Sequence, residues 1–145
     1  MKIIQIVLVA ALIFLFTCTQ SFDDLMYRGM IGFRFNPEPN FFELFQFNFT
    51  DLQDQPYIIQ KIGHFSSFTI FALLVFSWVR KYRLTLLVSI GYAITTEILQ
   101  LYFSRDGRFV DMFIDSAGVL AALLLITIKK QVDSEFERST KYTKK

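Results

Sequence analysis

Four ionisable side chains of this 145-residue chain lie inside apolar stretches long enough to cross a membrane: His64, Glu97, Asp111 and Asp115. On membrane-insertion scales, a charged side chain at the centre of a helix costs roughly 2.5–3.5 kcal/mol. Such residues persist where they have a partner or a function, so we interpret the four as parts of one polar site. His64, Glu97 and Asp115 are the candidate catalytic residues, because imidazole and carboxyl groups perform general acid–base chemistry.

Helical spacing adds three polar neighbours to this set. Lys61 precedes His64 by three residues, Gln100 follows Glu97 by three, and Arg108 precedes Asp111 by three. Residues three or four apart share a helix face. The predicted ligand-binding residues, expected to line one cavity open to the outer side, are Lys61, His64, Glu97, Gln100, Arg108, Asp111 and Asp115. The alternative is that these groups only join helices, and that Lys61 and Arg108 extend to the membrane interface.

Several chemistries find little support in the residue pattern. A His with three carboxylates could bind a divalent cation, but the spacings match no known metal motif, such as two His four residues apart beside a Glu, so we predict no metal and no cofactor. No Ser or Cys is paired with a base, which argues against covalent catalysis. The single Cys18 excludes an internal disulfide. Proton exchange between His64 and Glu97 stays open as a further interpretation.

The elements that position these residues are predicted to be membrane helices. Hydrophobic residues make up 53% of the chain, including 18 Phe. We predict an all-α bundle of four transmembrane helices over residues 3–17, 58–79, 84–103 and 109–128. The last three are about 20 residues each, which matches a 30 Å hydrocarbon core. The first is also short enough for a signal-peptide core, but without a cleavage site we expect an uncleaved anchor.

Charge distribution predicts the topology of one domain over residues 1–128. Lys and Arg are concentrated in residues 80–83 and in a basic tail, 129–145, whereas the loop 19–57 has two Arg and six acidic residues. The positive-inside rule therefore places both termini and the 80–83 link in the cytoplasm. The net charge of +2 is too small to indicate a nucleic-acid partner.

The outer loop, 19–57, is unusually rich in aromatic residues, with eight Phe. Soluble loops rarely expose so many rings, because contiguous apolar patches bind or aggregate. We interpret the loop as an interfacial or re-entrant segment that covers the bundle. The alternative is a platform for a lipid-linked or amphiphilic ligand.

Three ordered segments of the second half together resemble the VanZ-like family of bacterial membrane proteins. They are Lys61-Ile62-Gly63-His64-Phe65, Glu97-Ile98-Leu99-Gln100, and Gly107-Arg108 followed by Asp111 and Ile114-Asp115-Ser116-Ala117-Gly118. The chain departs from the family at Gln60, where Asp is frequent, and at Ala122, where a final Gly is frequent. The resemblance implies a multi-pass protein of the bacterial cell membrane, and a link to teicoplanin-type glycopeptide resistance through the founding member.

Two functions follow as expectations. The first is a non-enzymatic membrane protein that lowers the binding of a lipophilic glycopeptide or helps to maintain the cell envelope. The second is a membrane enzyme that acts on a lipid-linked envelope precursor, with Glu97 or Asp115 as general base and His64 as acid. Proton-coupled transport is disfavoured, because the bundle is small and has no broken helices or inverted repeat. The expected partners are membrane lipid, a glycopeptide or a lipid-linked precursor; enzyme activity and oligomeric state stay open.

Overall fold

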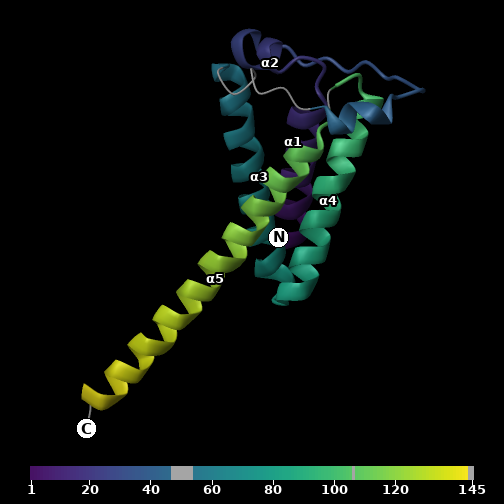
Figure 1. The fold of residues 1–145 in the computed structure, drawn as a ribbon. Coiled ribbons are helices and arrows are strands. Elements are labelled where there is room, and N and C mark those ends of the chain that lie inside the picture. Colours follow the sequence, from purple (N-terminus) through teal and green to yellow (C-terminus); the bar gives the residue numbers. More distant parts are fainter. Residues whose placement is uncertain (47–53, 106, 144–145) are drawn as a thin grey trace.

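The computed structural model describes residues 1–46, 54–105 and 107–143, and throughout these ranges its regular elements are helices. Four longer helices, α1 (Lys2–Cys18), α3 (Gln55–Val79), α4 (Tyr82–Tyr102) and α5 (Phe109–Thr143), form a bundle (Figure 1). The short helix α2 (Phe22–Arg28) and the 3-10 helix η1 (Phe41–Phe45) lie at one end of it. The prediction of an all-α membrane bundle is confirmed.

Three helices, α3, α4 and α5, are each long and apolar enough to cross a membrane. The fourth candidate is a bent pair, since α1 meets the same criterion only together with α2, to which it is inclined by 108°. The predicted first span, 3–17, lies entirely within α1. The break after α1 follows from local sequence, because the Ser21 hydroxyl caps a new helix by accepting the Asp24 N–H at 3.1 Å.

Local signals also set the ends of the central helices. Pro56 lies in the first turn of α3, where its missing N–H is not needed. The helix ends at Arg80, which adopts a left-handed conformation (φ 57°) and donates its N–H to the Phe76 carbonyl at 2.9 Å. Only Arg80 and Lys81 separate α3 from α4. This tight link makes the two helices antiparallel neighbours.

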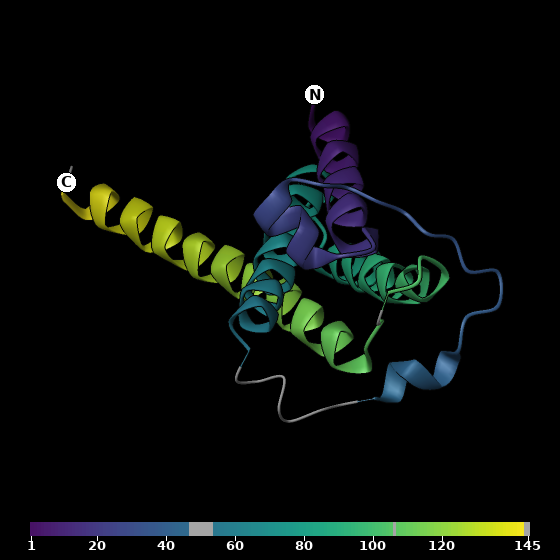
Figure 2. The same ribbon diagram turned by 90° about the horizontal axis from the view of Figure 1, so that it is seen from above.

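The central helix of the bundle is α3, which packs against α1, α4 and α5 (Figure 2). Its buried residues Phe68, Phe71, Ala72 and Val75 form the apolar core together with residues of the other three helices. At the crossing of α3 and α5, a Cβ on Gly118 would collide with the Phe65 carbonyl oxygen. The absence of a side chain at this position therefore lets the two backbones approach closely.

Basic residues gather on one side of the bundle. Lys2 Nζ donates to the Ser77 carbonyl at 2.9 Å, near the α3–α4 link. Lys130 Nζ lies 4.9 Å from the Phe76 ring centroid and 4.8 Å from that of Tyr82. The start of α1, the Arg80–Lys81 link and Lys130 are therefore on the same side, as the charge pattern predicted.

The last helix is longer than its predicted span. α5 has 35 residues, about 50 Å at 1.5 Å per residue, compared with a hydrocarbon core of about 30 Å. The first part of the predicted basic tail, up to Thr143, thus continues the fourth span as the same helix and projects beyond the bundle (Figure 1).

Candidate functional site

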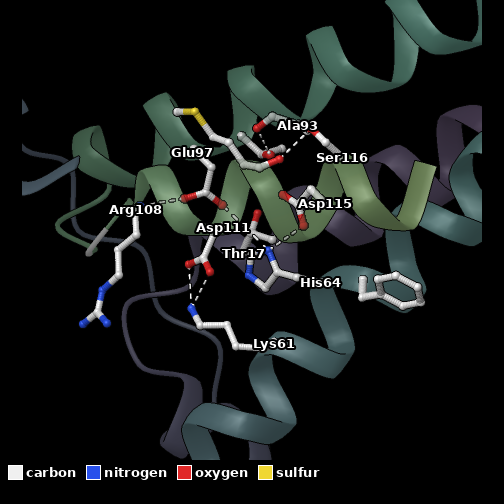
Figure 3. A network of polar contacts seen from close by, with 12 residues as sticks. Thr17, Lys61, His64, Ala93, Glu97, Arg108, Asp111, Asp115 and Ser116 are labelled. Atoms are coloured by element: carbon white, nitrogen blue, oxygen red, sulfur yellow. Dashed lines mark hydrogen bonds and ion pairs between the residues drawn. The ribbon is translucent and has the colours of Figure 1, made fainter. Parts of the chain in front are cut away.

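Three buried side chains from three helices meet at one point in the bundle: His64 of α3, Glu97 of α4 and Asp115 of α5 (Figure 3). His64 Nδ1 lies 3.0 Å from Asp115 Oδ1 and 3.7 Å from Glu97 Oε1. The imidazole is 5% exposed, and both carboxyl groups have no exposed surface. The convergence expected from shared depth and helical spacing is thus present in the structure.

Both oxygens of Glu97 accept hydrogen bonds. Gln100 Nε2 donates to Oε1 at 2.8 Å, and the backbone N–H of Arg108 donates to Oε2 at 2.9 Å. Gly107 makes the second contact attainable, because any Cβ there would collide with the Glu97 carbonyl oxygen. The link between α4 and α5 therefore fixes the orientation of the carboxyl group.

Arg108 contributes to this site through its backbone. Its guanidinium points away from the His64 cluster (Figure 3), and its Cζ lies 5.5 Å from the centroid of the Tyr57 ring. The sequence prediction placed the Arg108 side chain among the polar groups of the site. In the structure its main-chain N–H makes the contact with Glu97, while Arg108 also lines a polar cavity beside the cluster.

Beside the cluster, Lys61 and Asp111 form a separate ion pair. Lys61 Nζ lies 2.6 Å from the Asp111 carboxylate, which is 1% exposed. The lysine also lies 4.3 Å from the centroid of the Tyr57 ring, in a cation–π contact. Sequence reasoning missed Tyr57, although its position four residues before Lys61 on the same helix face was a usable signal.

Two buried oxygens of the site have neither a hydrogen-bond donor nor an ion-pair partner among the described residues: Asp115 Oδ2 and Gln100 Oε1. Both residues have no exposed surface. Buried polar atoms in folded proteins are nearly always paired, so an unpaired acceptor at a polar cluster needs a physical explanation.

Two of the cavities beside the cluster are relevant to the predicted site, where a single open cavity was predicted. The larger, of about 350 Å³, is lined mainly by apolar side chains of α1, α2 and α3 and has His64 in its wall. The smaller, of about 170 Å³, is lined by polar side chains that include Lys61, Arg105 and Arg108. Gln60 lines both cavities. The four remaining predicted residues lie behind these walls, because close helix packing encloses them: Glu97, Gln100, Asp111 and Asp115.

The described part of the aromatic loop, residues 19–46, lies over the ends of the helices; Phe47 and Phe49 of the predicted loop lie outside the described residues. Phe33 stacks with Phe14 of α1 at 6.1 Å between ring centroids and meets Phe103 edge-on at 5.7 Å. Phe45 stacks on Phe109 of α5 at 5.9 Å. These contacts agree with the interpretation of the loop as a cover, while its contact with a membrane surface stays a prediction.

The residues of all three motif segments thus come together in space, at the junction of α3, α4 and α5. A family model described as VanZ/LLP1 matches residues 3–130. The chain belongs to the VanZ/LLP1 family. It is 33% identical over 127 residues to YwnJ, an uncharacterized membrane protein of Bacillus subtilis strain 168, covering 87% of this chain and 91% of the relative. No solved structure matches the chain. The family resemblance read from the motifs is confirmed, and the chain is a membrane protein of this family.

Proposed function

We propose that the chain is a multi-pass protein of the bacterial cell membrane that binds an amphiphilic envelope component, or a lipophilic glycopeptide, at the outer side. Through this binding it contributes to teicoplanin-type glycopeptide resistance or to envelope maintenance. The observation that carries the proposal is the apolar cavity of about 350 Å³ with His64 in its wall. A cavity lined by apolar groups with a few polar ones is the usual form of a small-molecule site.

The positive charge of the neighbouring cavity supports an amphiphilic molecule as the ligand. Lys61, Arg105 and Arg108 line the smaller cavity, and Gln60 joins it to the apolar one. An anionic head group has favourable electrostatic interactions with the cationic side chains, while its hydrocarbon portion occupies the apolar cavity. Lipid-linked envelope precursors and lipophilic glycopeptides both combine polar and apolar parts.

A second function is favoured by the contact between His64 and Asp115. An imidazole 3.0 Å from a buried carboxylate, at the wall of a ligand-sized cavity, is an arrangement suited to general acid–base catalysis. The alternative proposal is therefore a membrane enzyme that acts on a lipid-linked envelope precursor. His64 would serve as acid, and Glu97 or Asp115 as base.

The test combines gene deletion with two variants, Glu97→Gln and His64→Ala. We expect both variants to keep near wild-type abundance in the membrane and to lose the glycopeptide resistance or envelope phenotype of the native protein. Glu38→Gln is the matched control, since Glu38 lies exposed in the loop, away from the cluster. Full activity of Glu97→Gln would leave helix–helix packing as the role of the cluster and contradict the proposal.

Profiling of envelope precursors separates the two functions. An enzyme changes the chemical structure of the lipid-linked precursors, so deletion would accumulate an unmodified species. A binding protein changes glycopeptide sensitivity while the precursors keep their composition.

We also propose that both termini and the link 80–83 face the cytoplasm. The Lys and Arg distribution supports this orientation. Reporter fusions after Arg83 and at the C-terminus should both behave as cytoplasmic. An external signal from either fusion would contradict the topology.

A further inference from the structure

We infer that His64, Glu97 and Asp115 form a binding site for one divalent transition-metal ion of the zinc and manganese class. The inference deepens the proposed function, on which it rests for its biological role, because the metal would occupy the same site. Metal binding by the purified chain can be measured without reference to any phenotype.

The geometry brings three ligand atoms together. One imidazole nitrogen and one oxygen from each carboxyl group all lie within 4.8 Å of one another. Metal–ligand bonds of 2.0–2.2 Å put neighbouring ligand atoms of a tetrahedral ion roughly 3.4 Å apart. The distances from His64 Nδ1, 3.0 Å to Asp115 and 3.7 Å to Glu97, bracket this value. An ion therefore fits with small adjustments of the three side chains.

Charge in the buried cluster also favours a divalent cation. Lys61 Nζ already neutralises Asp111 at 2.6 Å. The other two carboxyl groups, Glu97 and Asp115, contribute two negative charges beside the single imidazole once both are ionised, as metal ligands are. An uncompensated charge is expensive within a membrane bundle, and one divalent ion bound with neutral His64 balances both carboxylates.

The unpaired oxygens are an independent observation that points to a ligand. Asp115 Oδ2 and Gln100 Oε1 are fully buried, and no described residue donates a hydrogen bond to either. Both atoms are electron-pair donors, so the partner that each lacks is a proton donor or a cation. Asp115 belongs to the ligand set, and Gln100 contacts Glu97 through its amide nitrogen at 2.8 Å.

Surrounding contacts hold one of the ligands in place. Gln100 and the Arg108 N–H fix the two oxygens of Glu97, which is the usual role of groups that surround metal ligands. One imidazole with two carboxylates suits Zn²⁺, Mn²⁺ or Fe²⁺, whereas Ca²⁺ and Mg²⁺ prefer oxygen ligands alone. The cavity that reaches His64 supplies an entry path.

The test measures metal binding by the full chain, purified in lipid nanodiscs without a polyhistidine tag and treated with a chelator. Titration with Zn²⁺ and Mn²⁺, followed by dialysis and mass spectrometry of the metal content, should give one ion per chain for at least one metal. Asp115→Asn and Glu97→Gln should each weaken this binding at least tenfold. Glu38→Gln, which removes an exposed loop carboxylate, should bind as wild type does. Absence of stoichiometric binding of both metals would overturn the inference.

A second measurement uses the wild-type protein alone, so that it does not depend on the folding of a variant. X-ray absorption of the zinc-loaded or manganese-loaded chain should show one imidazole nitrogen among oxygen ligands. His64 is the single histidine of the chain, so this signature identifies the site. A coordination shell without imidazole would overturn the inference.

Failure of the metal site and failure of the proposed function give different results. A stoichiometric metal in a chain whose deletion leaves glycopeptide sensitivity and the envelope unchanged supports the site and contradicts the function. A clear deletion phenotype in a chain that binds neither metal supports the function and overturns the metal site.

Discussion

Side chains are equally well buried in the two halves of the bundle, but those of one half are mainly apolar and those of the other mainly polar. In the apolar half, toward the α3–α4 link, the enclosed residues of α3 are Phe71, Ala72, Val75 and Phe76. In the polar half, toward the α4–α5 link, the buried residues include five with charged or amide side chains, His64, Glu97, Gln100, Asp111 and Asp115. The same helices, α3 and α5, run through both halves.

The difference shows how a membrane bundle is stabilised in two ways. Lipid tails are as apolar as Leu, so the apolar half gains little from leaving lipid and depends on close packing. The polar half depends on specific partners, because removing one member of a buried ion pair leaves the other uncompensated. We therefore expect substitutions in the two halves to differ in how much stability they remove. We also expect the effects of paired substitutions to be non-additive in the polar half.

The largest loss of stability is expected for a substitution where the two halves meet, at Gly118. In Gly118→Ala the new Cβ would collide with the Phe65 carbonyl oxygen and crowd Thr69 Oγ1, at 3.1 Å. Because a backbone atom cannot rotate away, we expect more than the 1–3 kcal/mol typical of overpacking, and loss of most folded protein. Membrane abundance and thermal unfolding measure this effect. Gly91→Ala, where a Cβ meets nothing within 4 Å, is the matched control and should remain folded.

The second-largest loss of stability is expected when the ion pair of the polar half is broken. Lys61→Met leaves Asp111 buried without its cation, which should cost about 3–5 kcal/mol of unfolding free energy. The double variant, Lys61→Met with Asp111→Leu, should recover most of that loss, since both charges are then gone. Chemical unfolding of the four proteins in a double-mutant cycle gives the coupling. Strictly additive losses would show that the two side chains do not stabilise each other.

A smaller effect is expected in the apolar half. Val75→Ala removes a side chain that is 2% exposed and should cost on the order of 1 kcal/mol through lost packing contacts. Leu73→Ala, on the same helix but 37% exposed, is the control and should change stability less. Unfolding curves of both variants test whether packing stabilises this half; equal losses would argue against it.

The smallest effect is expected outside both halves, in α2. Arg28 Nη1 lies 3.0 Å from Asp24 Oδ1, but the two side chains are 71% and 43% exposed. Solvent screens such a pair, so Arg28→Ala should change the unfolding free energy by less than about 0.5 kcal/mol. A larger change in the same unfolding assay would show that α2 contributes more to the fold than its contacts indicate.

The sequence allowed the helices and the central site to be predicted, because charge inside an apolar stretch is expensive and therefore informative. His64, Glu97 and Asp115 each stand out for this reason, and they meet in the structure. The side-chain direction of Arg108 could not be predicted, since its backbone N–H serves Glu97 whatever side chain it carries. The cavities also could not be predicted from the sequence. The larger depends on α2 residues such as Leu25 lying beside Ile59 of α3, an arrangement that no local spacing encodes.

The contact between Gly118 and Phe65 divides α5 into a short N-terminal part and a much longer C-terminal part, which can pivot about this contact. A screw motion of α5 by one residue would replace Gly118 with Ala117 or Val119, each with a Cβ, at the Phe65 carbonyl, so the close contact at Gly118 opposes this motion and leaves pivoting as the easier relative motion of the two helices. From Gly118, Asp115 is three residues away and Thr143 is 25, or about 4.5 Å and about 37 Å at 1.5 Å per residue. A pivot that shifts Asp115 by a fraction of an ångström therefore displaces the far end of the helix roughly eightfold more.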